Sequence, residues 1–265
     1  MVDGADHPGR TAPAPVKRLL RREVGYGCPV PGCASPYLEY HHFDPPFAQG
    51  PHHRPEGMIA LCGEHHAKAD GGSFTLDQLR EFKRSSYALS AEVKGRFDWR
   101  RRDLITRVGG NFYLRTPVMV EIAGHAVVCE RRDEDGMLLL SVAMISKTKE
   151  PRLVMVDHEW YTIGTPVDFE SPPSGRRIHA QYDNGDRLSI QFWDATDADI
   201  FIARYSRPDE PVYVADGVQF PVAVAEVEME VGGTNISFGP EETRAGGVLM
   251  RNCWVMDCGI GFSIG

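Results

Sequence analysis

The sequence has no run of about 18 consecutive apolar residues, the minimum for a membrane-spanning helix, although 42% of its 265 residues are hydrophobic. We therefore expect no transmembrane segment. Residues 1–23 also lack the apolar centre of a secretory signal, and their Pro, Gly, Ala and charged residues predict a disordered leader with a helix starting at "VKRLLRR". These absences favour a cytoplasmic location, where cysteines are more often metal ligands, catalytic groups or core residues than disulfides.

Cysteine and histidine are scarce after the first quarter of the chain, which holds three of the six cysteines and seven of the ten histidines. Charge is uneven as well. Residues 1–107 carry 16 Lys and Arg against 13 Asp and Glu, whereas residues 108–265 carry 13 against 24, a net charge of −11. DNA would be attracted to the first part and repelled by the second. The chain therefore divides functionally near residue 108.

The first part alternates short elements with loops rich in Pro and Gly. "YLEYHHF" and "MIALC" are typical of short strands, and "GEHHAKADGG" is typical of a helix ended by glycine. Thr75 and Gln78 form a capping box that starts a further helix. Apolar residues then recur at mostly helical spacings, which predicts one long helix or two consecutive helices ending before Gly109.

From residue 111 the pattern changes to many short extended runs. Two of them surround "DEDG" and two surround "DNGD", which are strong hairpin signals, and "DIFIARYS" and "TNISFG" are among the further expected strands. This pattern predicts an all-β sandwich or barrel. The last 20 residues have the Asn, Cys and Gly texture of a parallel β-helix, so a partial β-helix is a third possibility. No paired carboxylates or nucleophile motif in this region supports a hydrolase site.

Two short-spaced pairs of metal-ligand residues stand in the first part. "CPVPGC" offers Cys28 and Cys33 on a loop, and "CGEH" offers Cys62 and His65 at the junction of a strand and a helix. Zn²⁺ prefers four thiolate or imidazole ligands supplied in such pairs. The alternative is that core cysteines happen to lie near surface histidines. The pairing favours a structural zinc site.

Three histidines remain outside this set. His41 and His42 are neighbours on a strand and face opposite ways, and His66 points about 100° away from His65 on the helix. If the helix packs across the hairpin, two of these imidazoles converge on one side. The third could then act on whatever the first two hold.

The segment "LEYHHFDP…EGMIALCGEHHAKADGG", preceded by "CPVPGC", resembles the HNH endonucleases over residues 24–84. That family has a ββα-metal core with a His-His or Asp-His pair on its first strand. The resemblance implies that His42 is the general base that activates water. It implies that His41 and His66 hold one divalent cation, Mg²⁺ or Mn²⁺, and that the Cys28, Cys33, Cys62 and His65 set is a structural zinc knuckle.

The sequence departs from the family at one position. Many members have Asn five residues before the L-C cysteine, where it supports the loop that bears the base histidine, and here that position is Gly57. Glu56 or a histidine of "PHH" could replace it. Arg54, His53 and Lys68 are candidate DNA contacts, and for Lys68 a solvated helix position is an equally good explanation. His52 and His53 could contact phosphate or add a metal ligand, but exposed loop positions explain them better. Asp70, four residues after His66, could orient that histidine or cap the helix.

The expected fold class is α+β. It comprises the leader, an HNH ββα-metal module over 24–84, a helical linker over 85–110 and a β-rich regulatory or assembly domain over 111–265. The leading hypothesis is a metal-dependent DNA endonuclease whose acidic second domain senses a ligand, binds a partner protein or forms a homo-oligomer, as in bacterial antiviral defence or restriction effectors. The alternative is a non-catalytic zinc module that binds nucleic acid or protein, attached to a β-rich binding domain.

Overall fold

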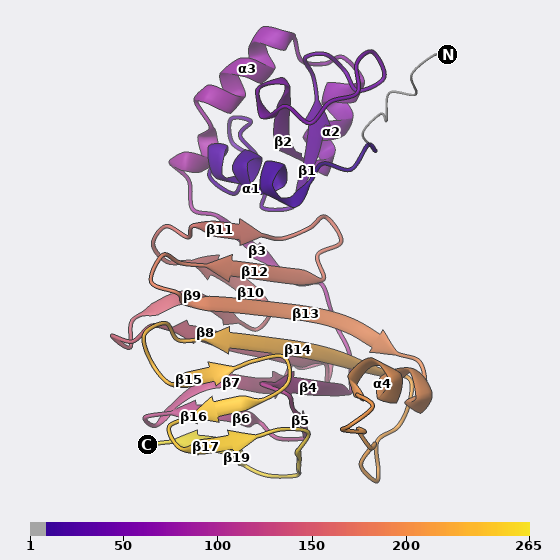
Figure 1. Cartoon of the computed structure of the whole chain (residues 1–265), viewed down its shortest axis with the longest axis vertical. Helices are drawn as coiled ribbons and strands as arrows, with labels where there is room; N and C mark the ends of the chain where they lie inside the picture. Colours follow the sequence, from indigo (N-terminus) through magenta and orange to yellow (C-terminus); the bar gives the residue numbers. More distant parts are fainter. Residues whose placement is uncertain (1–8) are drawn as a thin grey trace. The chain divides into compact units, whose positions relative to one another are not determined.

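The computed structural model describes residues 9–265, and the chain forms two compact units. Unit 1 contains the residues up to Gly95 together with Val167–Gly175, and unit 2 contains Arg96–Pro166 and Arg176–Gly265. The fold class is α+β, as expected, with most of the regular structure in strands (Figure 1). No helix in residues 9–265 is both long and apolar enough to cross a membrane.

Unit 1 is built around a hairpin that leads into a helix. Strand β1 pairs antiparallel with β2, so that Leu38 lies opposite Cys62 and His42 opposite Met58. The regular elements of this unit, besides the single turns of 3₁₀ helix Pro55–Gly57 and Tyr87–Leu89, are α1 (Ala14–Glu23), β1 (Leu38–His42), β2 (Met58–Cys62), α2 (Gly63–Asp70), α3 (Leu76–Arg84) and β11 (Asp168–Glu170). The helix expected near "VKRLLRR" is α1, and residues 1–8 of the expected leader lie outside the described residues.

Local sequence explains the ends of these helices. Helix α2 stops at Asp70 because Gly71 and Gly72 follow, and Gly72 adopts a φ of +75°, a conformation that favours glycine. Helix α3 begins with the expected capping box, in which the Thr75 hydroxyl accepts from the Gln78 N–H and the Gln78 side chain accepts from the Thr75 N–H.

The core of unit 1 forms around β2, where Met58, Ile59, Ala60 and Leu61 are fully buried. Such a continuously apolar strand is covered on both faces. Helix α1 contributes Leu20 to this core. The hairpin of two five-residue strands is therefore anchored in the core through β2. This anchoring fixes the positions of the polar residues of β1 and α2.

Unit 2 consists of two sheets. In one the strand order is β19-β6-β7-β8-β9-β10, and in the other β14 has β13 along one edge and β4, then β15, along the other. The elements of the two sheets, with the helix α4, are β4 (Leu104–Val108), β5 (Asn111–Leu114), β6 (Val118–Ile122), β7 (His125–Arg132), β8 (Leu138–Ile145), β9 (Pro151–Val156), β10 (Glu159–Thr162), β12 (Arg177–Gln181), β13 (Arg187–Ala195), α4 (Ala198–Tyr205), β14 (Val222–Glu230), β15 (Ile236–Phe238), β16 (Thr243–Ala245), β17 (Val248–Met250), β18 (Trp254–Met256) and β19 (Ile260–Ile264). The short strand β3 (Lys94–Arg96) falls at the boundary between the units in the sequence.

The two sheets of unit 2 pack face to face as a β-sandwich. Alternate residues of β8 and β13 are buried, as expected where one face of each sheet meets a core. Phe192 of β13 meets His158, next to β10, with ring centroids 5.5 Å apart, and Phe238 of β15 meets Phe262 of β19 at 6.4 Å. Of the three possibilities left open by the sequence, the sandwich is the one observed.

The final segment nevertheless has one feature of a β-helix. Strand β18 pairs in parallel with β5, and β19 pairs in parallel with β6, so residues 254–264 run alongside residues 112–122. A single such pass does not stack into repeats, and each of the two strands instead extends one sheet of the sandwich.

Two predicted elements are wrong. The helical linker over 85–110 is absent, because only Tyr87–Leu89 is helical there and Leu104–Val108 forms β4, fully buried between β5 and β14. Its β-branched Ile105, Thr106 and Val108 suit a strand. "DIFIARYS" is not a strand but lies largely in α4, which Asp197 caps by accepting a hydrogen bond from the Ile200 N–H at 2.9 Å.

Candidate metal centres and the histidine cluster

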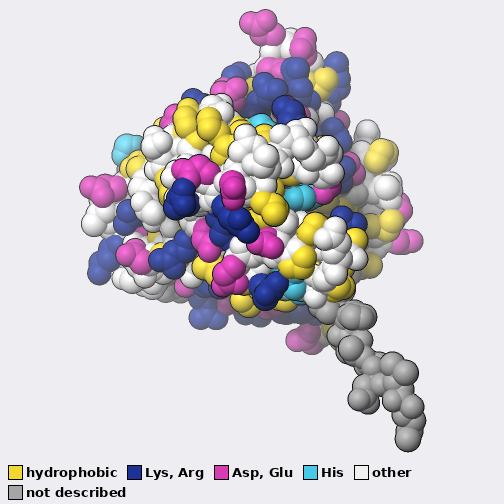
Figure 2. Space-filling view, turned by 90° about the horizontal axis from the view of Figure 1, so that it is seen from above, with side chains coloured by type: hydrophobic (Ala, Val, Ile, Leu, Met, Phe, Trp, Pro, Cys, Tyr) yellow, Lys and Arg dark blue, Asp and Glu magenta, His cyan; other side chains and the backbone are white. Residues whose placement is uncertain are grey.

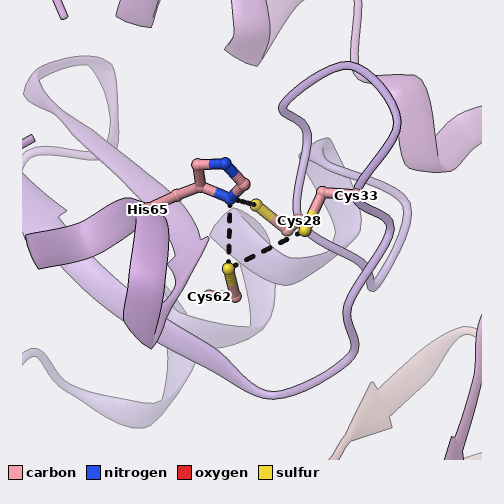
Figure 3. Close-up of side chains that lie close together, drawn as sticks. All are labelled: Cys28, Cys33, Cys62 and His65. Atoms are coloured by element: carbon pink, nitrogen blue, oxygen red, sulfur yellow. Dashed lines mark hydrogen bonds between the residues drawn. The ribbon is translucent and has the colours of Figure 1, made fainter. Parts of the chain in front are cut away.

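The four residues of the predicted zinc knuckle lie together in unit 1. Cys28 and Cys33 come from the loop before β1, while Cys62 ends β2 and His65 lies in the first turn of α2; all four point toward one another (Figure 3). The loop is closed by backbone hydrogen bonds from Cys28 N to Ser35 O and from Cys33 N to Val30 O. Backbone hydrogen bonds therefore fix the loop that carries Cys28 and Cys33, and this loop lies against the β2–α2 junction that carries Cys62 and His65.

The distances between these side chains fit a tetrahedral metal site. A tetrahedron with bonds of about 2.3 Å to sulfur and about 2.0 Å to nitrogen has S···S edges of about 3.8 Å and S···N edges of about 3.5 Å. Cys33 Sγ lies 3.8 Å from Cys62 Sγ, and His65 Nδ1 lies 3.3 Å from Cys28 Sγ and 3.2 Å from Cys62 Sγ. The cluster can bind a metal such as zinc.

Burial raises the pKa of the Cys28 and Cys62 thiols. A buried thiolate is unfavourable without a nearby cation, so metal binding here must release protons. The chemistry of this donor set, three thiols and an imidazole, suits Zn²⁺ and offers no oxygen ligand for Mg²⁺.

A second cluster lies on the other side of α2 and joins His41 of β1 to His66 and Asp70 of α2. Asp70 Oδ1 is 3.2 Å from His41 Nδ1, and Asp70 Oδ2 is 3.3 Å from His66 Nδ1. The two imidazole rings meet edge to face with centroids 5.2 Å apart. The predicted pair His41 and His66 is therefore brought together, and Asp70 supplies a third donor.

The geometry of this second cluster also suits a cation. Adjacent ligands of an octahedral ion with bonds of about 2.1 Å lie about 3.0 Å apart, close to the two carboxylate–imidazole distances. The same distances suit ion pairs between Asp70 and protonated imidazoles, but burial and the neighbouring His66 lower the pKa of His41. Because His41 is then largely neutral, its nitrogen is available as a ligand at neutral pH.

His42 occupies a different environment from His41. Its ring contacts are with Phe47, His52 and His53, at centroid distances of 4.9, 5.2 and 5.7 Å. Its Nε2 is buried and has no hydrogen-bond partner among residues 9–265. The alternation of the strand thus separates the two neighbouring histidines, as expected from their spacing.

The basicity of His42 differs from the expectation of an ordinary imidazole. Burial, with His52 as the next cause, lowers the pKa of His42 to about 4. The ring is therefore neutral across the neutral pH range, but it is a weaker base than a free imidazole. A phosphate group beside it would raise its pKa, because negative charge favours the imidazolium.

Gly57 is required by the backbone around His42. The carbonyl of Gly57 accepts from the N–H groups of Phe43 and Asp44 at 2.9 and 3.2 Å, which anchors the chain directly after His42. A Cβ at position 57 would lie 2.1 Å from the Asp44 oxygen and 2.9 Å from a ring carbon of His52. No side chain fits here without displacement of the backbone.

His52 is buried, contrary to the prediction of an exposed loop residue. Its Nε2 lies 3.0 Å from the Pro45 carbonyl, which can only accept, and its Nδ1 accepts from the Arg54 N–H at 3.1 Å. These two bonds fix a neutral ring with the proton on Nε2. His52 is therefore a support for the His42 ring rather than a metal ligand, one of the two replacements considered for the missing Asn.

The three predicted DNA contacts lie on two elements: His53 and Arg54 are neighbours in the loop after β1, and Lys68 is in α2. Arg54 and Lys68 are exposed, and Lys68 is paired with Glu64 at 2.6 Å. His53 is half-buried against His42 and Phe47, and its Nδ1 has no hydrogen-bond partner in the described part of the chain. On the face shown in Figure 2, basic and acidic side chains are interspersed. That face carries no continuous basic surface for DNA.

Two contributors to the His41 cluster were not assigned from the sequence. For Asp70 the sequence allowed two roles, orienting His66 or capping the helix, although its spacing of four residues from His66 placed both on the same helix face. Glu39 was missed; its Oε2 lies 3.6 Å from His66 Nδ1. The sequence signal that could have identified Glu39 is its position two residues before His41, because residues two apart lie on the same face of a strand.

A comparison of this chain with protein-family models, with curated proteins and with solved structures found no match. The two donor clusters and the histidine cluster around His42 are therefore the observations from which a function can be argued.

Proposed function

We propose that unit 1 is a metal-dependent DNA endonuclease module of the HNH type. The observation that carries the proposal is the second cluster, in which His41, His66 and Asp70 meet on a β-hairpin followed by a helix. The neighbouring Cys28, Cys33, Cys62 and His65 cluster supports it, because the resemblance implies a structural zinc site in the same hairpin and helix.

Each residue of the two histidine clusters has a separate role in the proposed hydrolysis. Bound at His41, His66 and Asp70, a divalent cation would offset charge on the scissile phosphate and on the leaving 3′ oxygen. His42 takes a proton from the attacking water through its Nε2, which has no hydrogen-bond partner in the described chain. His52 and the Gly57 carbonyl hold His42 in place. Arg54 and His53 lie beside this cluster and are the candidate phosphate contacts.

The test is nicking of supercoiled plasmid by the full chain with Mg²⁺ or Mn²⁺. We expect His42→Ala and His66→Ala to lower the rate by at least about a hundredfold. His125→Ala is the matched control, because His125 is an exposed histidine of β7 in unit 2. If the wild-type protein and His42→Ala nick equally, or if neither cuts with either metal, the proposal is rejected.

One observation favours a second candidate, a non-catalytic zinc module that binds nucleic acid or protein. The pKa of His42 is about 4, which is low for a general base at neutral pH. This candidate expects the zinc ligands to matter for binding, and His42→Ala to bind DNA as the wild type does with no cleavage by either protein. The acidic unit 2, in either case, suits a small ligand or a protein partner better than DNA.

A further inference from the structure

A pocket of about 420 Å³ lies in unit 2, on the face of the larger sheet against which α4 packs. Figure 1 shows α4 near one end of β13 and β14. Its lining includes Arg107 of β4, Glu226 and Glu228 of β14, and Arg204 and Tyr205 of α4. Arg107 and Glu226 are register partners on parallel strands. The pocket is therefore built on rigid strands and closed by a helix, as small-molecule sites often are.

Glu226 is fully occupied by its neighbours. Arg204 donates to both of its oxygens, at 2.8 and 3.0 Å, and the Tyr205 hydroxyl donates to Oε1 at 2.7 Å. The Trp193 indole N–H in turn donates to the Tyr205 oxygen at 3.0 Å. These hydrogen bonds occupy both oxygens of Glu226, which makes no hydrogen bond or ion pair with Arg107 and acts on it only as a nearby charge.

Arg107 is the unusual residue of the pocket. It is only 9% exposed, its Nε has no hydrogen-bond partner, and no carboxylate of residues 9–265 forms an ion pair with it. Its guanidinium is held by aromatic faces, 4.5 Å from the Tyr205 ring centroid and 5.5 Å from that of Phe112. Burial lowers the pKa of Arg107 although Tyr205, Glu226 and Glu228 act in the opposite direction, so the nearby charges do not replace a direct ion pair. A guanidinium fork pairs best with a carboxylate or phosphate.

The carboxyl group of Glu228 makes no hydrogen bond or ion pair within the described chain. Burial and the neighbouring Glu226 raise its pKa, and the charge of Arg107 opposes them. The remaining acidic residues of the lining, Glu210 and Glu241, are paired with Arg207. The pocket thus has one cation and one carboxyl group that attract each other but make no direct ion pair or hydrogen bond within the described chain.

We propose that this pocket binds a small molecule with one anionic head group, a carboxylate or a phosphate monoester, on Arg107 and a hydrogen-bond donor such as an amine on Glu228. The lining carries four glutamates against three arginines, so it has no excess of positive charge to attract a polyanion. The ligand is therefore of low net charge, such as a free amino acid or a nucleoside monophosphate. The inference does not depend on nuclease activity in unit 1.

The test is isothermal titration calorimetry of the full chain with three sets of probes: inorganic phosphate, the free α-amino acids and the nucleoside 5′-monophosphates. We expect saturable binding of at least one probe that carries both an anion and a donor. Arg107→Gln should weaken it about tenfold or more, since a charge-assisted pair is lost. Arg131→Gln is the matched control, because Arg131 is already paired with Asp157 on an exposed strand.

Two further variants separate ligand binding from folding. Arg107→Lys keeps the charge but loses the planar fork, so it should remain folded and still bind more weakly than the wild type. Glu228→Gln should weaken only the probes that carry an amine. Binding by nucleotides but not amino acids assigns a phosphate head group, and the reverse assigns a carboxylate. If no probe binds, or if Arg107→Gln binds as tightly as the wild type, the proposal is overturned.

Discussion

Gly57 determines how closely the chain approaches itself beside His42. Its carbonyl anchors Phe43 and Asp44, and the space where a Cβ would stand is filled by the Asp44 oxygen. Gly57, which replaces the Asn found in many HNH endonucleases, is therefore required by the close approach of this backbone. Support for the histidine comes from main-chain groups and His52 rather than from an Asn side chain.

We expect Gly57→Ala to lower the free energy of unfolding of unit 1 by about 1–3 kcal/mol, the usual range for overpacking. Gly63→Ala is the control: it lies at the start of α2, where a Cβ would meet nothing nearer than 3.6 Å. Urea denaturation followed by circular dichroism measures both variants. Equal stability of Gly57→Ala and the wild type would contradict the close approach seen at this position.

His158 is a second residue whose burial has a measurable consequence. It is 2% exposed, both ring nitrogens lack hydrogen-bond partners within residues 9–265, and burial lowers its pKa to about 4, with a small opposing effect of Asp157. Above pH 6.5 neither the folded nor the unfolded state binds a proton here. Between about pH 6.5 and 4 only the unfolded state does, so stability falls as the pH falls.

The expected loss at His158 approaches about 3 kcal/mol by pH 4 and grows no further below it. His158→Asn should flatten this part of the pH profile, since Asn does not titrate and tolerates the φ of +70° at this position. Chemical denaturation at a series of pH values gives the difference between the two proteins. Parallel profiles would show that His158 is protonated in the folded state as easily as in the unfolded state.

At the scale of elements, α2 contributes to both candidate metal clusters, on different faces. His65 points to the cysteines, while His66 and Asp70 point to His41. Because the two histidines are adjacent on one helix, a single short element fixes the orientation of a structural and a candidate catalytic site at once.

Two imidazoles and one carboxylate form a donor set that favours Mn²⁺ and later transition metals over Mg²⁺, which prefers oxygen. We expect Mn²⁺ to bind the wild type more tightly than Mg²⁺, and Asp70→Asn to weaken Mn²⁺ binding about tenfold or more. Asp77→Asn, an exposed carboxylate at the start of α3, is the control. Electron paramagnetic resonance of free Mn²⁺ measures the affinity, and no change in Asp70→Asn would remove Asp70 from the site.

The short strand β11 shows how an element can be recruited from far along the chain. Asp168 is buried in unit 1, where it accepts from Arg21 at 2.8 and 3.0 Å and from Arg18 at 2.9 Å. Arg21 also donates to the Tyr40 hydroxyl at 2.9 Å, two residues before His42 on β1. The segment 167–175, which belongs to unit 1, is thus linked through Asp168 and Arg21 to β1, the strand that carries His41 and His42.

Removal of Asp168 leaves the buried Arg21 with only the longer ion-pair contact to Glu170, at 3.9 Å, so Asp168→Ala should destabilise unit 1 by about 3 kcal/mol, the lower end for a broken buried pair. Asp194→Ala, which breaks a half-exposed pair with Arg101, should cost less than about 1 kcal/mol. Thermal and urea denaturation compare the two. A neutral effect of Asp168→Ala would mean that Arg21 finds solvent or another acceptor.

At the scale of the whole molecule, the two units depend on different interactions. The core of unit 1 includes Cys28 and Cys62 beside a small apolar cluster, whereas unit 2 has a sandwich core between large sheets. Small domains rely more on metals than larger ones do, because they bury less apolar surface.

Removal of zinc with 1,10-phenanthroline should therefore expose unit 1 to trypsin and leave unit 2 protected. Cys62→Ala should reproduce the same pattern without a chelator. Limited proteolysis with mass spectrometry identifies the cleaved segments. If both units lose protection together, their stabilities are coupled, and if neither does, the cysteine cluster contributes nothing to folding.

The sequence by itself determined the local elements and the donor pairs. Spacing placed Cys28 with Cys33 and Cys62 with His65, and alternation on β1 divided His41 from His42, because these depend only on the periods of strand and helix. The sequence pattern gave the wrong element for residues 104–108 and 198–205, because the spacing of their apolar residues suits both a helix and a strand. Burial between neighbouring strands makes the first a strand, and a capping residue makes the second a helix.

Only the tertiary structure decided what lies across from each side chain. It placed Asp70 between His41 and His66, filled the space at Gly57 with the Asp44 carbonyl, and lowered the pKa of His42 through burial beside His52. It also brought Asp168 to Arg21 and left Arg107 without a direct ion pair among residues 9–265. Such effects depend on contacts between residues far apart in the chain and on exclusion of water, neither of which a local pattern contains.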